Sequence, residues 1–191
     1  MKKFVAALAV VPLVFSLAAC GSSSNGNGDS KKITIGVVGN ETANQVLKDE
    51  AAKQGITIEY SEFTDYAQPN PAVDAGDNDM NRFQHIAYLA NYNVSSGKDL
   101  QIVGSTNIYP MAIFSKKHKK VDEIPQGGTI AIPNDSVNEA RALLLLKAQN
   151  LVTFKSEVHT PTHNDIDTGK SKVKVTPVDA TQTVIAMESV D

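Results

Sequence analysis

The feature that most restricts the fold is a strand, a helix and a second strand that follow one another within about thirty residues. Residues 33–38 read I-T-I-G-V-V, a β-branched run that ends at Gly39-Asn40 and predicts a buried strand. Residues 41–54 place apolar side chains at helical spacing, and residues 56–63 alternate between apolar and polar. Because two parallel strands need such a crossover connection, the pattern predicts a right-handed βαβ unit and a parallel sheet.

The alternation of strands and helices starts again after a basic run, K-K-H-K-K at residues 116–120, which is interpreted as a solvated surface turn. This predicts an α/β protein of two lobes, a first over 33–112 and a second over 113–191, with ligands bound where loops at strand ends converge. The other expected elements are a short helix within 64–80, a helix over 81–96, a strand over 100–105, an extended segment over 109–115, a strand from Gly128, a helix over 138–149, a strand over 172–178 and a helix over 179–188.

The N-terminal region has the composition of a targeting segment followed by a tether. Residues 1–19 combine M-K-K with an apolar stretch and small residues, which is typical of a signal peptide and not of a membrane span. Cys20 follows directly and is the single cysteine of the chain, so an intramolecular disulfide is impossible. Ordinary cleavage near residue 19 and lipidation of Cys20 both stay open. Residues 20–32 are rich in Gly, Ser and Asn and predict a flexible tether.

Charge restricts the class of ligand. The formal net charge is −3, and basic residues do not form a stripe along any predicted helix or strand. An acidic body of this kind is not expected to bind nucleic acid.

One spacing resembles a calcium site but fails in detail. Asp77, Asp79 and Asn81 have the opening spacing of a calcium-binding loop. Arg82 and Tyr88 stand where such a loop needs Gly and Glu, so no calcium site is predicted.

A second spacing resembles a zinc site. His159 and His163 are four residues apart, but Pro161 between them is incompatible with a helix interior, and a solvated loop is the preferred interpretation. The chain contains neither a G-x-S-x-G motif nor a Gly-rich phosphate loop. The sequence therefore predicts no metal, no cofactor and no catalytic residues, although its 21 carboxylates leave an acid–base pair possible.

Two segments carry candidate binding residues. N-R-F-Q-H-I-A-Y-L, residues 81–89, brings Phe83, His85 and Tyr88 close together, and the spacing of the two aromatic residues alone favours a core face. P-N-D-S-V-N-E-A-R, residues 133–141, places Asn138 and Arg141 three apart near the start of a helix. An arginine there can bind a carboxylate in bidentate fashion, and a solvent-facing arginine is the alternative.

Several separated stretches together resemble one family, the methionine-binding NlpA lipoproteins of ABC importers. The resemblance implies a two-lobed periplasmic-binding-protein architecture of type II that closes over a free amino acid, without catalysis. It also implies a lipid on Cys20, attachment to the extracytoplasmic face of the cell membrane, and permease and ATPase subunits of an importer as partners. The matching stretches are L-A-A-C at 17–20, F-T-D-Y-A-Q-P-N at 63–70, F-Q-H-I-A-Y-L at 83–89, Y-P-M-A-I-F-S-K-K at 109–117, I-A-I-P-N-D at 130–135, N-E-A-R-A-L-L-L-L at 138–146 and V-D-A-T-Q-T at 178–183.

The same resemblance implies six ligand-binding residues. Those expected at the side-chain end of the ligand are Tyr66, Phe83, His85 and Tyr88, and those expected at its backbone end are Asn138 and Arg141. A thioether is soft and favours aromatic neighbours, and a carboxylate that loses its water needs a charged partner, so the chemistry is consistent with methionine. His85 is expected to donate hydrogen bonds and pack, not to act as a base.

Departures from the family pattern widen the expected specificity. Ala87, Met80 and Ser136 stand where the family usually has proline, alanine and proline, so the ligand is expected to be methionine, a related amino acid or a short peptide that contains one. The family also continues beyond the position that matches Asp191. The sequence is therefore expected to be a C-terminally truncated member with an incomplete second lobe, weak in binding and in stability.

Two other functions stay open at this point. One is an extracytoplasmic enzyme on a similar scaffold, which would need a nucleophile or paired carboxylates facing Phe83 and Tyr88. The other is a degenerate lipoprotein that no longer binds solute.

Overall fold

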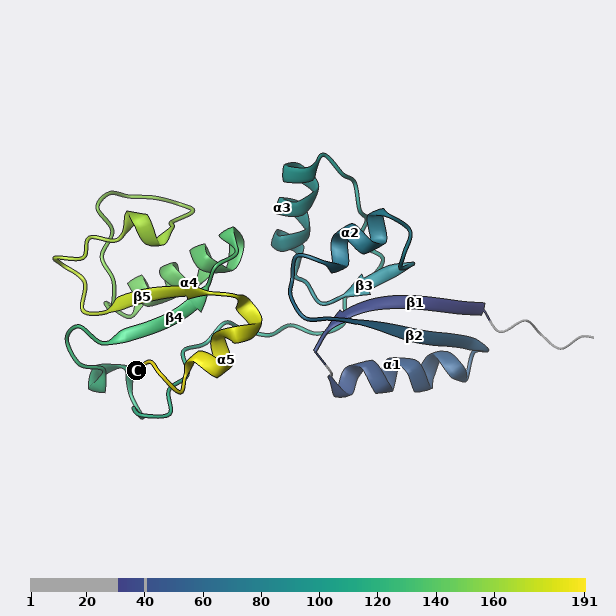
Figure 1. The fold of residues 1–191 in the computed structure, drawn as a ribbon, viewed down its shortest axis with the longest axis horizontal. Coiled ribbons are helices and arrows are strands. Elements are labelled where there is room, and N and C mark those ends of the chain that lie inside the picture. Colours follow the sequence, from purple (N-terminus) through teal and green to yellow (C-terminus); the bar gives the residue numbers. More distant parts are fainter. Residues whose placement is uncertain (1–30, 40) are drawn as a thin grey trace, which may run out of the picture.

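The computed structural model describes residues 31–39 and 41–191, which form two lobes joined by one long connection (Figure 1). The predicted signal peptide, Cys20 and the tether as far as residue 30 lie outside the described residues. Within the part that is described, no helix has both the length and the apolar character needed to cross a membrane.

The first lobe is built on the predicted βαβ unit. Strand β1 (Lys31–Val38) pairs in parallel with β2 (Ile56–Phe63) over their full lengths, and helix α1 (Thr42–Ala52) connects them. A third strand, β3 (Met80–Arg82), pairs in parallel with the other side of β1, so the sheet order is β2-β1-β3. The apolar side chains at the centre of this lobe are Ile35, Val37, Ala51 and Ile58. The predicted parallel sheet is confirmed.

Two helices complete the first lobe, and one of them starts later than the sequence pattern indicates. Helix α2 (Pro69–Asp74) has proline in its first turn, where the missing N–H costs nothing. Helix α3 (Ile86–Ser96) ends at Gly97, which adopts the left-handed conformation. The predicted helix over 81–96 is wrong for its first five residues, because residues 80–82 pair with β1 and His85 is an extended N-cap.

The second lobe has a smaller parallel sheet of β4 (Thr129–Pro133) and β5 (Lys174–Val178). Helix α4 (Ser136–Ala148) begins after Asp135, whose side chain accepts a hydrogen bond from the backbone of Asn138. Leu143, Leu146 and Ile132 lie in the core of this lobe. The strand predicted from Gly128 and the helix predicted over 138–149 are confirmed within two residues.

The C-terminal helix predicted over 179–188 is much shorter than expected. A 3-10 turn (Ala180–Gln182) is followed by the four-residue helix α5 (Thr183–Ala186). The side chain of Asp179 accepts from the backbone of Thr181 and fixes the turn after β5. The apolar residues at helical spacing therefore predicted a longer helix than the structure contains. Two more 3-10 turns occur in this lobe, Val121–Glu123 and His163–Asp165.

The connection between the lobes contains no regular structure. Residues 98–115 form neither helix nor strand, so the strand predicted over 100–105 is wrong. Arg82 attaches the connection to the first lobe, since its Nη2 donates to Oδ1 of Asn107 at 2.8 Å. The same guanidinium donates through Nη1 to Oε2 of Glu41 at 3.0 Å and to Oδ1 of Asn44 at 2.7 Å. The predicted lobe boundary at 112/113 falls inside this connection and stays a prediction.

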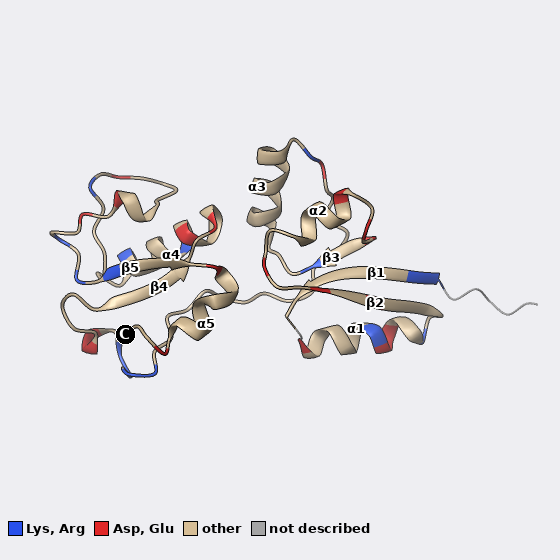
Figure 2. Ribbon diagram, viewed as in Figure 1, with Lys and Arg blue, Asp and Glu red and all other residues tan. Residues whose placement is uncertain are grey.

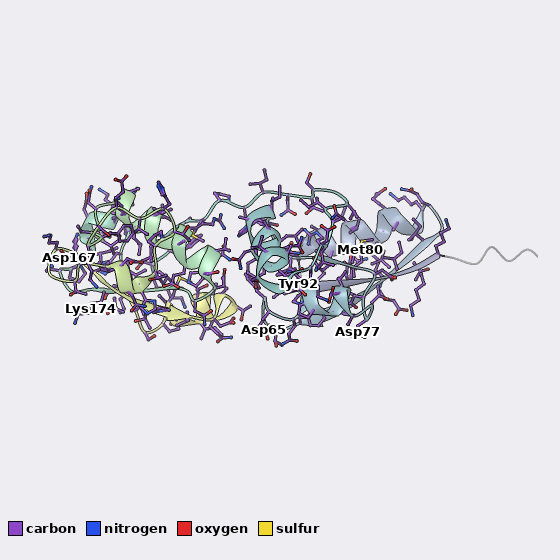
Figure 3. The ribbon with its side chains drawn as sticks, turned by 90° about the horizontal axis from the view of Figure 1, so that it is seen from above. Asp65, Asp77, Met80, Tyr92, Asp167 and Lys174 are labelled. Atoms are coloured by element: carbon purple, nitrogen blue, oxygen red, sulfur yellow. The ribbon has the colours of Figure 1, made fainter. Side chains whose placement is uncertain are left out.

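The carboxyl ends of both sheets point toward the space between the lobes, and helices α3 and α4 face each other across it (Figure 1). In the view from above, Asp65 and Tyr92 lie on the side of the first lobe that is near the second, whereas Asp167 and Lys174 lie at the far end of the second lobe (Figure 3). Loops that follow the strands therefore converge between the lobes, as expected for a ligand site in an α/β protein.

Candidate ligand-binding cleft

A cleft with a volume of about 210 Å³ lies between the lobes. The first lobe contributes most of the wall, and the second contributes the two residues at the start of α4. This volume is below the range of about 300–1,000 Å³ that is typical of sites for drug-sized ligands, and it suits a smaller molecule. The lining residues are Tyr66, Ala67, Asn70, Tyr88, Asn91, Tyr92, Ser95, Asp135 and Ser136.

Tyr66 and Tyr88 line one side of the cleft, and the ring of Phe83 packs against both of them without lining it. The ring centroids of Tyr66 and Phe83 are 5.6 Å apart, those of Tyr66 and Tyr88 6.1 Å, and those of Phe83 and Tyr88 5.7 Å. Each pair is edge-to-face, which is a favourable geometry for aromatic side chains and fixes the three rings relative to one another. The structure therefore brings together all four side chains that were expected at the side-chain end of a ligand, since the ring centroid of His85 is 6.3 Å from that of Tyr88.

The strands of the first lobe explain why these rings meet. Tyr66 follows the end of β2 and Phe83 follows the end of β3, so parallel pairing through β1 brings the two rings to one edge of the sheet. Tyr88 lies in the first turn of α3, and its hydroxyl donates to the backbone carbonyl of Tyr66 at 3.0 Å. No hydrogen bond to a described residue engages the hydroxyl of Tyr66.

His85 connects this aromatic cluster to the second lobe. Its Nδ1 accepts from the backbone N–H of Tyr88 at 3.2 Å as the N-cap of α3, so the ring proton is carried by Nε2. That Nε2 donates to Oδ1 of Asn138 at 2.9 Å, and the same oxygen accepts from Nη1 of Arg141 at 2.8 Å. His85, Asn138 and Arg141 thus form a chain of hydrogen bonds from α3 to α4, although none of them lines the cleft.

The start of α4 holds Asn138 in position. Oδ1 of Asp135 accepts from the backbone N–H of Asn138 at 2.9 Å, and Oδ2 accepts from its side-chain Nδ2 at 3.0 Å. Both oxygens of the one carboxylate that lines the cleft therefore hold Asn138. Among the described residues, the guanidinium of Arg141 has no hydrogen bond other than the one from Nη1, so most of its donors stay available to a ligand.

The electrostatic field at the aromatic wall is negative. Burial raises the pKa of Tyr66, and the carboxylates of Asp135, Asp179 and Glu41 raise it further. Burial also raises the pKa of Tyr88 to about 12, with smaller contributions from Asp135, Asp65, Tyr66 and Asp179. These carboxylates come from loops after four different strands. In the charge view, α3 carries no charged residue, whereas both signs occur on the facing helix α4 (Figure 2).

Burial, together with these smaller contributions, predicts a late titration of Tyr88. The folded-state pKa of about 12 lies above the ordinary value of 10.0, so the stabilising difference is fully present below pH 10 and is lost as pH rises through 12. Spectrophotometric titration of the tyrosines should show a component near pH 12 that Tyr88→Phe removes. Tyr109→Phe, a change at an exposed residue of the connection, should leave that component in place, and its loss there would contradict the assignment.

A network of side-chain amides supports the wall from behind. Nδ2 of Asn70 donates to Oε1 of Gln84 at 2.9 Å, and Nε2 of Gln84 donates back to Oδ1 of Asn70 at 2.6 Å. Asn81 joins both partners, donating to Oδ1 of Asn70 at 2.8 Å and accepting from Gln84 at 3.0 Å. Asn70 is only 1% exposed. This network fixes the chain on both sides of Phe83 relative to α2.

Sequence reasoning missed several lining residues. Asn91, Tyr92 and Ser95 extend the face of α3 that Tyr88 begins, and the helical spacing from Tyr88 could have identified them. Asn70 lies in the first turn of α2, the element that follows β2 and Tyr66, so its position after the strand was the available signal. Asp135 was recognised only as a helix cap.

His163 and Asp79, from the two rejected metal motifs, each have other partners. His163 begins a 3-10 turn, and both its backbone N–H and its Nδ1 contact Oε1 of the buried Glu139, at 2.7 and 2.6 Å. The expectation of a purely solvated loop is therefore wrong for His163, which attaches the loop before β5 to α4. Oδ2 of Asp79 accepts from the backbone of Thr34 at 2.7 Å and holds β3 against β1.

Comparison with known proteins agrees with this geometry. Residues 33–191 match the family described as NlpA lipoprotein. Outer membrane lipoprotein 1 of Mannheimia haemolytica is 41% identical over 168 residues, which cover 84% of this chain and 60% of that protein. The chain thus spans 60% of the length of this relative.

Two solved structures are similar in both sequence and fold. The substrate-binding protein of a methionine transporter from Streptococcus pneumoniae has a TM-score of 0.76 at 38% identity, covering 84% of this chain and 66% of that one. A nutrient-binding protein from Burkholderia cenocepacia bound to methionine has a TM-score of 0.76 at 37% identity, covering 83% and 69%. The α/β substrate-binding-protein fold expected from the sequence is confirmed.

Proposed function

The chain belongs to the NlpA lipoprotein family, and we propose that it binds methionine or a closely related free amino acid in the cleft between its lobes. The single observation that carries this proposal is the composition of that cleft: Tyr66 and Tyr88 of the first lobe, supported by the ring of Phe83, line it together with the start of α4 on the second lobe. The methionine named for the two solved relatives supports the same ligand.

In the proposed complex, the thioether lies against Tyr66 and Tyr88, whose rings Phe83 supports from behind. Sulfur is polarizable and makes favourable contacts with aromatic edges. The hydroxyl of Tyr66 is available to a polar group of the ligand. The neutral His85 contributes packing and its bond to Asn138, not proton transfer.

The amino-acid head group lies toward the second lobe. Arg141 binds the carboxylate through the donors that Asn138 leaves available, and the N-terminus of α4 adds positive potential. Asp135 supplies a negative charge near the ammonium group. A zwitterion thus meets a charge of each sign within about two turns of the start of α4.

The biological role that follows is capture of the amino acid for an ABC importer. A lipid on Cys20 attaches the protein to the extracytoplasmic face of the cell membrane, and the permease and ATPase subunits receive the ligand. Chemistry is not part of this role. The cleft offers a single carboxylate instead of the pair that hydrolysis would use, and that carboxylate already accepts two bonds from Asn138.

Isothermal titration calorimetry tests the proposal. We expect methionine to bind more tightly than alanine by about 2 kcal/mol, roughly 30-fold, because the longer side chain buries apolar surface against the rings. Both stereoisomers and norleucine should be titrated, and the Burkholderia cenocepacia protein serves as a positive control. Binding by the control but no heat with any amino acid here would support the degenerate lipoprotein instead.

A further inference from the structure

The connection between the lobes is attached to the first lobe at two separate places (Figure 1). The first place follows the end of α3. The backbone N–H of Lys98 donates to the carbonyl of Asn93 at 2.9 Å, and its ammonium group pairs with Oδ2 of Asp74 at 2.6 Å. The side chain of Asn93 also accepts from the backbone N–H of Leu100 at 3.1 Å and donates to its carbonyl at 3.0 Å. The first lobe therefore holds the connection as far as Leu100.

The second place is Asn107, whose Oδ1 accepts from Nη2 of Arg82 at 2.8 Å. The guanidinium is oriented independently of this bond, because its Nη1 donates to Glu41 and to the buried Asn44. The side chain of Arg82 is only 12% exposed. Since the guanidinium is planar and two acceptors fix it, Nη2 is directed at the connection and little conformational entropy is lost when Asn107 binds.

The second lobe holds the chain again only a few residues later. Met111 packs against the core of that lobe. Between Asn107 and Met111, residues 108–110 make no hydrogen bond to any described residue. Pro110 has a fixed φ and restricts Tyr109 to extended conformations. The part of the connection that neither lobe holds is thus three residues long and has few free backbone dihedrals.

Arg82 also relates this unheld part to the ligand cleft. It is the last residue of β3, and Phe83, which follows directly, packs its ring against Tyr66 and Tyr88. One strand end therefore places both the support of the aromatic wall and the donor that holds Asn107. Rotation about residues 108–110 consequently starts from a point that is fixed relative to that wall.

We propose that Arg82 is a positioning residue for ligand binding, because its bond to Asn107 restricts the motion between the lobes to residues 108–110. Without that bond the unheld segment would be residues 101–110, ten residues instead of three. The effective concentration of one lobe at the other falls as the 3/2 power of the length of a flexible linker, so ligand binding should weaken about sixfold. The proposal rests on the ligand site proposed above, and it assigns control over closure of that site to a residue outside the cleft.

Distance measurements between the lobes test the hinge in the absence of any ligand. The full chain with Cys20→Ser carries spin labels at Val46→Cys on α1 and Lys147→Cys on α4, which are both exposed positions. Double electron–electron resonance gives the distribution of the distance between the labels. We expect Asn107→Ala to broaden this distribution. Asn107→Asp should keep it narrow, because a carboxylate still accepts from the guanidinium.

Calorimetric titration with methionine relates the hinge to binding. Asn107→Ala should bind about sixfold more weakly than the original chain, whereas Asn107→Asp should keep the original affinity. Thr106→Ala is the matched control, since Thr106 is an exposed neighbour without a hydrogen bond to any residue that the structure describes. It should change neither the affinity nor the distance distribution.

The two measurements separate this proposal from the proposed function. If the original chain binds no amino acid, the proposed function fails, and the distance distributions still decide whether Asn107 restricts the hinge. An unchanged distribution in Asn107→Ala, an equal broadening in Thr106→Ala, or a broad distribution in Asn107→Asp would each overturn the role of Arg82. Methionine binding that is equally tight in the original chain and in Asn107→Ala would overturn it as well.

Discussion

Replacing Arg141 with methionine is expected to weaken methionine binding by about 2–4 kcal/mol, roughly 30- to 1,000-fold. The ligand carboxylate loses its water when the lobes close, and the guanidinium is its nearest proposed source of charge-assisted hydrogen bonds. Methionine has an unbranched chain of similar length, so the substitution removes the charge and the donors while it keeps much of the apolar stem. Calorimetric titration measures the loss.

Lys147→Met is the matched control, because it removes one positive charge from the last turn of the same helix at an exposed position. We expect its affinity to stay within about twofold of the original, since the last turn of α4 is at the opposite end of the helix from the residues that line the cleft. Methionine amide, which lacks the carboxylate, adds a second test. The original protein should prefer methionine over the amide, and Arg141→Met should lose most of that preference. An unchanged preference would remove Arg141 from the site.

The strands that were predicted correctly are those that the sequence pattern of the segment itself and of its immediate neighbours identifies. Residues 33–38 and 56–63 have apolar or alternating runs bounded by turns, and a helix between them leaves parallel pairing as the natural arrangement. The strand predicted over 100–105 has an equally good composition but did not form. Strand propensity describes a surface that fits a sheet, and the sheet itself depends on neighbours that are distant in sequence.

This dependence on residues that are distant in sequence also explains why spacing alone did not predict the site. Phe83 and Tyr88 have spacing that suggests one helix, yet Phe83 follows a strand and Tyr88 lies on α3. Their contact results from the extended conformation of His85 between them, which the pattern does not reveal. The resemblance to the family grouped Tyr66, Phe83, His85 and Tyr88, which the structure places close together, and the spacing alone could not do so. The roles of all six predicted residues in ligand binding stay predictions.

His85 links local structure to the relative position of the lobes. The bond that caps α3 fixes its tautomer, and the fixed tautomer leaves an N–H for Asn138 on the other lobe. The second direct hydrogen bond between the lobes within the described chain joins Thr181 to the backbone carbonyl of Thr64 at 3.2 Å. Two direct hydrogen bonds between the lobes are few enough to allow a hinge motion of the kind that closes substrate-binding proteins over their ligands. Closure then depends mainly on the contacts that the ligand itself adds.

The stability of the second lobe depends on one face of α4, and two adjacent leucines test this. Leu143 is 0% exposed in the core, while Leu144 on the next position of the helix is 40% exposed. Leu143→Ala is expected to reduce the free energy of unfolding by about 3–5 kcal/mol, because it removes buried methyl groups and leaves a cavity. Leu144→Ala should cost about 1 kcal/mol or less, since its side chain is partly in water already.

Urea denaturation followed by far-ultraviolet circular dichroism compares the two variants on one scale. A loss of several kcal/mol is a large share of the total stability of a small protein, so Leu143→Ala should unfold at a much lower urea concentration. Both variants replace leucine with alanine on α4, so they change the helix propensity and the charge of α4 in the same way. The difference between their free energies of unfolding therefore reports core packing. Equal losses of unfolding free energy in the two variants would mean that α4 does not pack against β4 as described. In that case Asn138 and Arg141, one turn earlier on the same helix, would not be held in the positions from which they are proposed to bind the ligand.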